Sequence, residues 1–168
     1  MALTLNTNSY VTVDDADDYL DTRIDSANWF GSTYANKESA LVTATLVLDN
    51  QAWVGSAVSS SQALAWPRKN ATYTDNRMGR TTTFGTTDIP ADLKTAVYEQ
   101  ALHLIDNEDL LQQKTQTFES ISVGSISVSD SNGDVQQTPL KSDLAMRLIR
   151  PLLRKGVQGV GASWWRAN

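Results

Sequence analysis

Residues 90–105 read PADLKTAVYEQALHLI, and this stretch decides the fold. Its apolar residues recur at helical spacing and predict one long helix with a buried face. The residues expected to face inward are Leu93, Ala96, Val97, Ala101, Leu104 and Ile105. Pro90 suits the first helical position, where its missing N–H is not needed. Because an isolated helix is marginal in water, this one needs other helices to cover it.

Upstream of this stretch the sequence predicts two further helices. Thr12 and Asp15 resemble a capping box, with Asp in place of the usual Glu, and the first helix is expected to run to about Ile24. Its expected buried side is Ala16, Tyr19, Leu20 and Ile24. Asn36 is the expected N-cap of a second helix, whose apolar stripe is Ala40, Leu41, Ala44, Thr45 and Leu48. A short helix over residues 62–66 is expected to stop before Pro67.

The remaining segments are less regular. Residues 68–88 show no usable periodicity and predict a long exposed loop. From Thr117 the chain alternates apolar residues with serine, and Asn132-Gly133 is a hairpin-turn signal, so a β-hairpin insertion is expected at about 117–138. Ser142 is expected to cap a last helix that ends near Leu153.

The predicted fold is therefore mainly α: a small helical bundle with an inserted β-hairpin and an extended C-terminal arm. Residues 1–155 form the helical domain, and residues 156–168 form the arm. The expected core includes Leu41, Leu48, Trp66, Val97, Leu104 and Leu148.

Composition narrows the class of protein. The chain has 168 residues and no cysteine, so disulfides and thiolate metal sites are excluded. The opening MALTLNTNSYV lacks a basic, then apolar, signal sequence, and no apolar run approaches the ~20 residues that span a bilayer. We therefore expect a soluble protein made in a cytoplasm. The net charge is −5, with acids concentrated in residues 1–60 and bases in residues 141–168.

The sequence offers little for catalysis. His103 is the only histidine, and a lone histidine within a helix is more often a packing residue than a base. Gly156, Gly159 and Gly161 lack the following helix and the Lys-Ser/Thr pair of a phosphate-binding loop. The sequence thus predicts that the protein is not an enzyme and has no cofactor.

Two acidic segments are candidates for metal sites. Asp14, Asp18, Asp21 and Asp25 share one helix face, and a straight helix presents carboxylates in a row rather than as a converging cage. A solvated face is the favoured interpretation, with a ring-lumen lining or an ion site as the alternatives. Asp130-Ser131-Asn132-Gly133-Asp134 lacks the distal glutamate of a calcium loop and is interpreted as a turn. No metal site is predicted.

Two groups of residues are candidates for binding. Trp66 with Arg68 and Lys69 could stack on a base and contact phosphate; the alternative is that Trp66 fills the core while Arg68 forms a salt bridge. In the arm, exposed tryptophans would serve as interface anchors beside basic residues, unless the arm folds back over its own core. The predicted partner-binding residues are Trp164, Trp165, Arg166, Arg154 and Lys155.

Four segments together resemble a known family. They are SYVTVDDADDYL (residues 9–20), KESALVTAT (37–45), QALAWPR (62–68), and Ile89-Pro90 before the long helix. The combination is similar to head–tail connector, or adaptor, proteins of tailed phages. Some members of that family are labelled DnaT-like single-stranded-DNA-binding proteins, and this label supplies an alternative function.

The resemblance implies a structural protein of the virion at the head–tail junction, assembled in the host cytoplasm. It implies a dodecameric ring of this chain beneath the portal protein, with a tail or nozzle protein on the other side. Double-stranded DNA would pass through the lumen without being read, and no membrane would be involved. The acidic balance of the chain is consistent with such a lumen, because scattered negative charge reduces adhesion to DNA.

Overall fold

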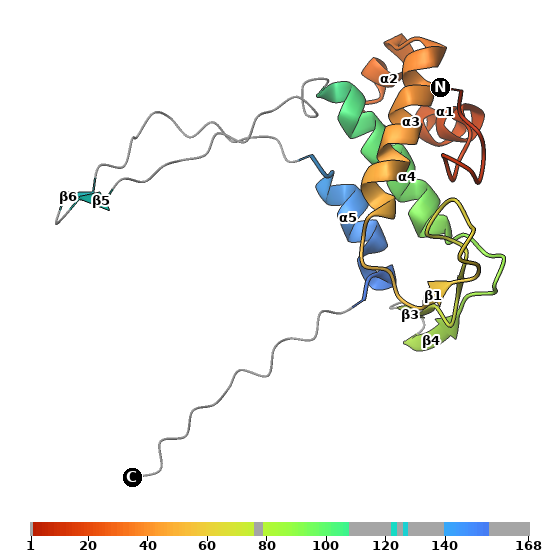
Figure 1. The fold of residues 1–168 in the computed structure, drawn as a ribbon. Coiled ribbons are helices and arrows are strands. Elements are labelled where there is room, and N and C mark those ends of the chain that lie inside the picture. Colours follow the sequence, from red (N-terminus) through yellow and green to blue (C-terminus); the bar gives the residue numbers. More distant parts are fainter. Residues whose placement is uncertain (1, 76–78, 108–121, 124–125, 128–139, 155–168) are drawn as a thin grey trace.

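The computed structural model describes residues 2–75, 79–107, 122–123, 126–127 and 140–154 (Figure 1). In this part of the chain helices dominate, as the sequence predicts. The α-helices are α1 (Val13–Asp21), α2 (Ala27–Gly31), α3 (Tyr34–Asp49), α4 (Ala91–Asp106) and α5 (Asp143–Ile149). A 3₁₀ turn, η2 (Arg150–Leu152), continues directly from α5 and contains Pro151.

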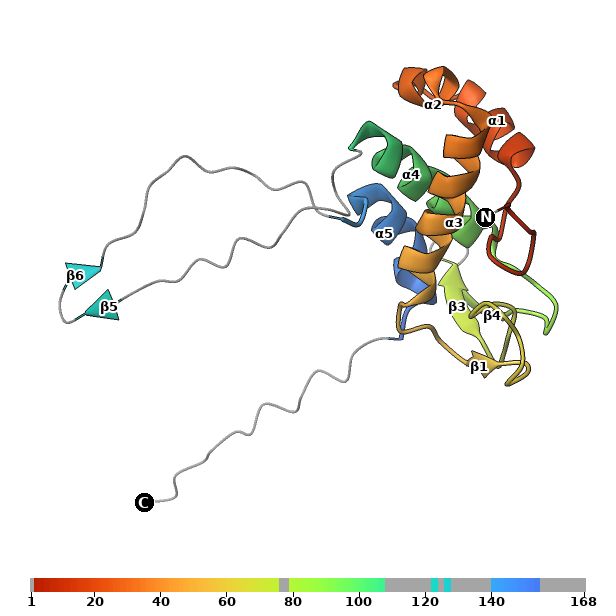
Figure 2. The same cartoon turned by 45° about the horizontal axis from the view of Figure 1, so that its top comes forward.

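Helix α4 is the centre of the bundle. It contacts α1, α2, α3 and α5, and Figures 1 and 2 show α3 and α5 lying along it. Its expected inward face is confirmed: Leu93, Ala96, Val97, Ala101 and Leu104 are buried, and Ile105 packs against the core. Of the other predicted core residues, Leu41, Leu48 and Trp66 are buried, whereas Leu148 is only partly buried.

The helix boundaries agree with the sequence at some ends and differ at others. The capping box is confirmed, since Asp15 N–H donates to the Thr12 hydroxyl and Thr12 N–H donates to the Asp15 carboxylate. Ser142 caps α5 as expected. The predicted cap at Asn36 is wrong, because the extended Thr33 accepts the Asn36 N–H and starts α3 one turn earlier. Pro90 is the N-cap of α4 and not its first residue.

The first helix is shorter than predicted. It ends at Asp21, and Ile24 lies in the following turn with 84% of its surface exposed, so its assignment to the buried side is wrong. The reversal that follows brings Arg23 back against α4. There the Arg23 Nε lies 2.8 Å from the buried Glu99 carboxylate, which also accepts the Tyr19 hydroxyl at 2.7 Å. Burial, followed by the hydrogen bond to Glu99, raises the pKa of Tyr19 to about 12.

Helix α2 was not anticipated, because five residues are too few to show a helical repeat. It carries Trp29, which is fully buried. The Trp29 indole N–H and the Lys37 ammonium both donate to the Asp17 carboxylate, at 2.6 Å and 2.8 Å. Asp17 therefore joins α1, α2 and α3 through one carboxylate oxygen.

The segment predicted as a long loop contains strands. The two-residue strands β1 (Ser56–Ala57) and β2 (Arg68–Lys69) pair antiparallel, and so do β3 (Thr72–Asp75) and β4 (Arg80–Thr83). These strands lack apolar alternation in the sequence; Tyr73 and Phe84 are the described residues through which the β3–β4 hairpin packs on the core. The loop prediction for residues 68–88 is wrong over these spans.

Residues 62–66 do not form the predicted short helix; residues 63–65 are bends. The Gln62 side-chain amide donates to the Leu64 and Pro67 carbonyl oxygens, at 2.6 Å and 3.2 Å. The Ala65 N–H is bonded to a side chain sixteen residues away. Because the Leu64 carbonyl and the Ala65 N–H are bonded to side chains, they do not form the backbone bonds of a helical turn.

The hairpin predicted at 117–138 is present in part. Strands β5 (Ser122–Val123) and β6 (Ile126–Ser127) pair antiparallel on either side of residues 124–125. The predicted turn at Asn132-Gly133 lies outside the described residues, and so does the C-terminal arm at 156–168.

Leu48 and Leu46 provide a matched test of the core. Leu48 is fully buried on α3, whereas Leu46, two residues earlier on the same helix, is 64% exposed. We expect Leu48→Ala to lower the free energy of unfolding by about 2–5 kcal/mol, through lost burial and the cavity that remains. Leu46→Ala should change it by less than about 0.5 kcal/mol. Urea denaturation of both variants checks this, and equal losses would contradict the packing of α3 described above.

Candidate functional site

The chain between α3 and β3 is held by the carboxylate of Asp49, the last residue of α3. The Tyr10 hydroxyl donates to this carboxylate, and the Ala65 N–H lies 3.0 Å from each of its oxygens. The Tyr10 hydroxyl in turn accepts the Trp66 N–H at 3.0 Å. Burial and, next, the bond to Asp49 raise the pKa of Tyr10 well above its usual range, so the phenol stays protonated as the donor.

Arg68 closes the other side of the same loop. Its guanidinium donates to three backbone carbonyl oxygens, those of Val54 at 2.7 Å, Ala65 at 3.0 Å and Gly55 at 3.0 Å. Burial and, next, the nearby positive charge of Arg154 lower the pKa of the Arg68 guanidinium. Among the residues that the structure describes, Arg68 forms no salt bridge of the kind predicted; it stabilises the loop through neutral acceptors.

Trp66 and Arg68 do not form the single-strand binding pair that was considered. Trp66 is only 2% exposed and packs edge-on against Trp53 and Phe84, at centroid distances of 6.0 and 5.4 Å. The prediction that Trp66 fills the core is confirmed. Trp66 and Arg68 thus form the platform on which the β3–β4 hairpin packs. A base could not reach the Trp66 indole unless this part of the fold opened.

The hairpin sits on this platform through its aromatic residues. The Phe84 ring contacts Trp66 from above and stacks on the Tyr73 ring, with centroids 4.7 Å apart. On the opposite side, the chain before β1 pairs with the chain after α5. Val54 N–H donates to the Leu152 carbonyl at 3.0 Å and Arg154 N–H donates to the Ala52 carbonyl at 2.7 Å. These contacts place η2 beside β3.

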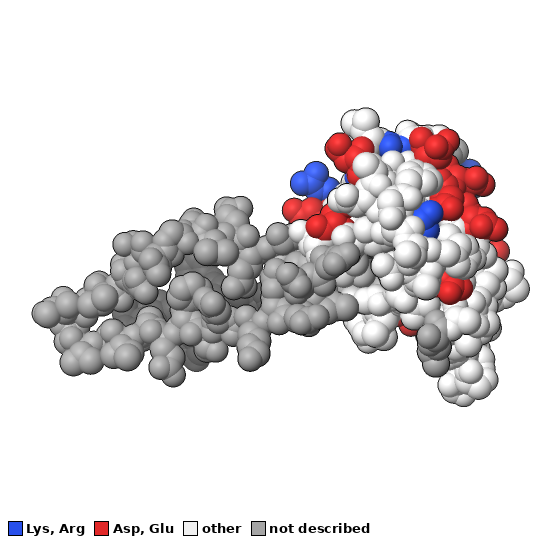
Figure 3. Space-filling view, turned by 90° about the horizontal axis from the view of Figure 1, so that it is seen from above, with Lys and Arg blue, Asp and Glu red and all other residues white. Residues whose placement is uncertain are grey.

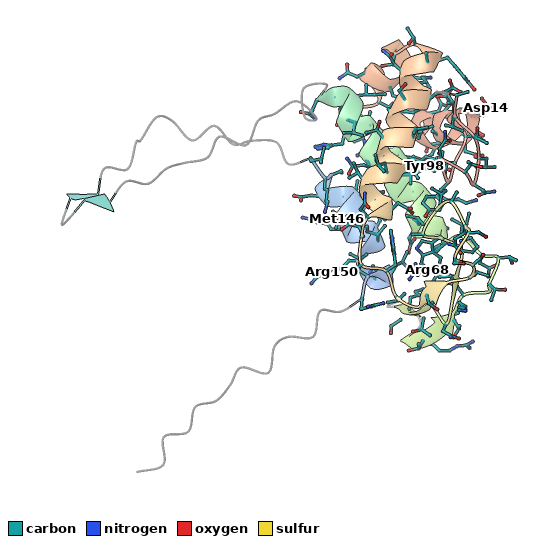
Figure 4. All side chains as sticks on the ribbon, viewed as in Figure 1. Asp14, Arg68, Tyr98, Met146 and Arg150 are labelled. Atoms are coloured by element: carbon teal, nitrogen blue, oxygen red, sulfur yellow. The ribbon has the colours of Figure 1, made fainter. Side chains whose placement is uncertain are left out.

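A groove of about 610 Å³ lies between the hairpin and η2. We call it the hydroxyl groove. It is lined by Val54, Thr72, Tyr73, Thr74, Thr81, Arg150, Pro151 and Leu153. Figure 4 shows Arg150 and Arg68 at the same end of the bundle, remote from Asp14.

The chemistry of the hydroxyl groove suits an anionic ligand. Thr72, Thr74 and Thr81 are exposed and bring hydroxyl groups that can donate hydrogen bonds. Arg150 is exposed and brings a guanidinium, whose fork of N–H groups matches phosphate geometry. Hydroxyls and arginine are typical protein donors to phosphate and sugar oxygens of nucleic acids.

The acidic stripe lies elsewhere. Asp14, Asp18, Asp21 and Asp25 are all exposed, which agrees with a solvated face. Asp and Glu side chains gather on the side of the molecule seen in Figure 3. Among the residues that the structure describes, no three His, Cys, Asp or Glu side chains come together as a metal site.

The predicted partner-binding residues are only partly visible. Arg154 is exposed at the end of the described chain, next to the hydroxyl groove residue Leu153. Lys155, Trp164, Trp165 and Arg166 lie outside the described residues, so their role stays a prediction. Over the described ranges, no helix is long and apolar enough to cross a membrane.

A second, smaller groove of about 290 Å³ separates α3 from the C-terminal end of α4. The described residues that line it are uncharged: Ser32, Asn36, Ser39, Ala40, Thr43, Leu104, Ile105 and Asn107. The hydroxyl groove is therefore the better candidate for an anion. Sequence reasoning missed it because its two walls come from residues 54–81 and residues 150–153, which are far apart in the chain. The run of threonines at 81–83 was the available signal.

The sequence matches the model of a family described as "Putative DnaT-like ssDNA binding protein", over residues 2–166. No curated protein and no solved structure matches the chain. The match overturns the assignment to the head–tail connector family, which was wrong. That assignment rested on short segments, each weakly specific, whereas the family match spans nearly the whole chain. The ring, the portal and tail partners and the virion location remain untested predictions.

Arg68 offers a direct test of the loop. Arg68→Lys keeps the positive charge, but the ammonium group of lysine lacks the planar fork of N–H donors with which the guanidinium reaches three carbonyl oxygens. We expect it to lower the free energy of unfolding by about 1–3 kcal/mol, because partly buried carbonyl acceptors lose their donor. Lys69→Arg, at the exposed neighbouring position, is the control and should be neutral. Denaturant titration measures both, and a neutral Arg68→Lys would show that the three bonds do not hold the loop.

Proposed function

Because the chain belongs to this DnaT-like ssDNA binding protein family, we propose that it binds single-stranded DNA, with the hydroxyl groove as the contact site. One observation carries the choice of site. In the hydroxyl groove the exposed hydroxyls of β3 and β4 face an exposed arginine, and both kinds of group are donors to phosphate.

The distribution of charge supports the same surface. Residues 140–154 hold four bases, Lys141, Arg147, Arg150 and Arg154, against the single acid Asp143. The acids of α1 lie at a different part of the bundle, as Asp14 and Arg150 show in Figure 4. A polyanion would therefore be steered toward α5 and η2 and away from α1.

Tyr73 adds an aromatic residue to the lining. Its ring is partly buried and stacks on Phe84, which holds it in one orientation. Aromatic rings in single-strand sites contribute by stacking with bases, a contact that tolerates any sequence. Because the described lining of the groove has one arginine and one tyrosine, the proposed binding is weak, independent of sequence and sensitive to salt.

This proposal replaces the earlier expectation that DNA passes the protein without adhesion. It also moves the contact away from Trp66 and Arg68, whose polar and aromatic groups are used inside the fold. The expectation that the protein is not an enzyme stays a prediction.

Arg150 and Arg147 provide a matched test, because Arg150→Ala and Arg147→Ala remove the same charge and give variants of equal net charge. Both are exposed, but only Arg150 lines the hydroxyl groove. We expect Arg150→Ala to weaken binding of a fluorescein-labelled oligothymidine about tenfold at low salt, the loss of a hydrogen bond to a charged group. The slope of log K against log salt should also fall by about one. Arg147→Ala should have a much smaller effect. Fluorescence anisotropy over a salt series measures both variants.

Two outcomes would contradict the proposal. If the wild-type protein does not bind oligothymidine at low salt, the chain is not a single-strand binder through any described surface. If both arginine variants weaken binding equally, the effect is one of overall charge, and the hydroxyl groove is not the site.

A further inference from the structure

Strand β4 has an unpaired edge. The β3–β4 hairpin is a sheet of two strands only. Phe84 N–H donates to the Ala71 carbonyl at 2.9 Å, which fixes which residues bond across the hairpin. Because bonded and non-bonded pairs alternate in an antiparallel ladder, Thr82 is bonded to Tyr73, whereas Thr81 and Thr83 point their backbone groups outward.

The outward backbone groups of Thr81 and Thr83 have no protein partner among the described residues. All four residues of β4 are exposed. Proteins usually protect such edges with lysine, proline, a bulge or a covering segment. The stretch Arg80–Thr83 has one charge, at its first residue, and no proline, while its three threonines are β-branched residues that favour strands.

We propose that β4 pairs antiparallel with β4 of a second copy of this chain, about a twofold axis at Thr82. In this register Thr81 of each copy lies opposite Thr83 of the other copy. The outward-pointing backbone groups of these two residues therefore form hydrogen bonds across the interface. Thr82 lies opposite the partner's Thr82 as a non-bonded pair. The contact uses the same five residues, 80–84, on both copies, as a twofold interface requires.

The charges and side chains of the strand favour this register. Arg80 lies opposite the partner's Phe84, and the two arginines are separated by the length of the strand, so no like charges meet. Thr81 and Thr83 share one face of the hairpin with Thr72 and Thr74, since side chains alternate along a strand. Pairing would extend this face into a four-stranded sheet with threonine on every strand, and cross-strand threonine pairs are favourable.

This inference does not depend on DNA binding. It concerns the edge of the hairpin and not the ligand in the hydroxyl groove. A contact of five residues per copy is small, so the dimer is expected to be weak and dependent on protein concentration.

Disulfide trapping tests the register, because the chain has no native cysteine. A Thr82→Cys variant would place two thiols across the axis, with Cα atoms about 4.5 Å apart, within the range that a disulfide spans. Thr83→Cys is the matched control, equally exposed on the same strand. In the proposed register, position 83 of one copy and position 83 of the other are two residues, about 7 Å, apart along the strand direction, in addition to the spacing between the strands. That separation is too large for a disulfide.

We expect Thr82→Cys to form a covalent dimer under mild oxidation much faster than Thr83→Cys, as measured by non-reducing electrophoresis over time. Equal rates, or faster dimer formation by Thr83→Cys, would overturn the proposed pairing.

A second pair of variants keeps the result independent of thiol chemistry. Proline at an outward-pointing edge position removes a donor that the hairpin does not use. Thr81→Pro should therefore abolish concentration-dependent association in sedimentation velocity, whereas Thr81→Val should retain it. Circular dichroism verifies that both variants fold. A wild-type chain that stays monomeric at the highest attainable concentration would overturn the proposal.

Discussion

The carboxylate of Asp49 is the group on which the lower half of the molecule depends. Asp49 is the last residue of α3, and its carboxylate accepts hydrogen bonds from the Tyr10 hydroxyl and the Ala65 N–H. These bonds join the N-terminal segment, α3 and the loop that leads to the strands. The loop has almost no regular structure, so its backbone groups need partners from elsewhere. Asp49 and Arg68 supply them from opposite sides. This fixes the position of Trp66, whose ring contacts Phe84; Phe84 in turn stacks on Tyr73 of the hairpin.

The bundle above this loop is held differently. Its core is apolar and centred on α4, and two polar clusters fix the short N-terminal helices against it. The Asp17 carboxylate accepts a hydrogen bond from Trp29 and pairs with Lys37. The Glu99 carboxylate pairs with Arg23 and accepts a hydrogen bond from the Tyr19 hydroxyl. A buried ion that lost its partner would be costly, so these clusters specify one arrangement of α1 and α2. The bundle thus provides a rigid base, and the candidate binding surface is added to one end of it.

The sequence predicts the bundle well and the binding end poorly, for a physical reason. Helices α1, α3, α4 and α5 follow from local patterns of apolar residues and caps, which need only neighbours in sequence. The loop does not, because the bond from Trp66 to Tyr10 joins residues 56 apart and no local pattern records it. The β3–β4 hairpin is missed because its threonines are polar on the exposed face. Arg68 was recognised as important, but its three carbonyl partners could not be read from the sequence.

Amide hydrogen exchange in an Asp49→Asn variant tests the central claim most directly. The substitution keeps the shape of the side chain but replaces one acceptor oxygen with a donor. The account predicts faster exchange at Trp66 and also at Thr82, in the hairpin, while Val97 in the core of α4 keeps its protection. If Trp66 loses protection and Thr82 does not, the hairpin is held independently of Asp49, and the dependence described here is wrong.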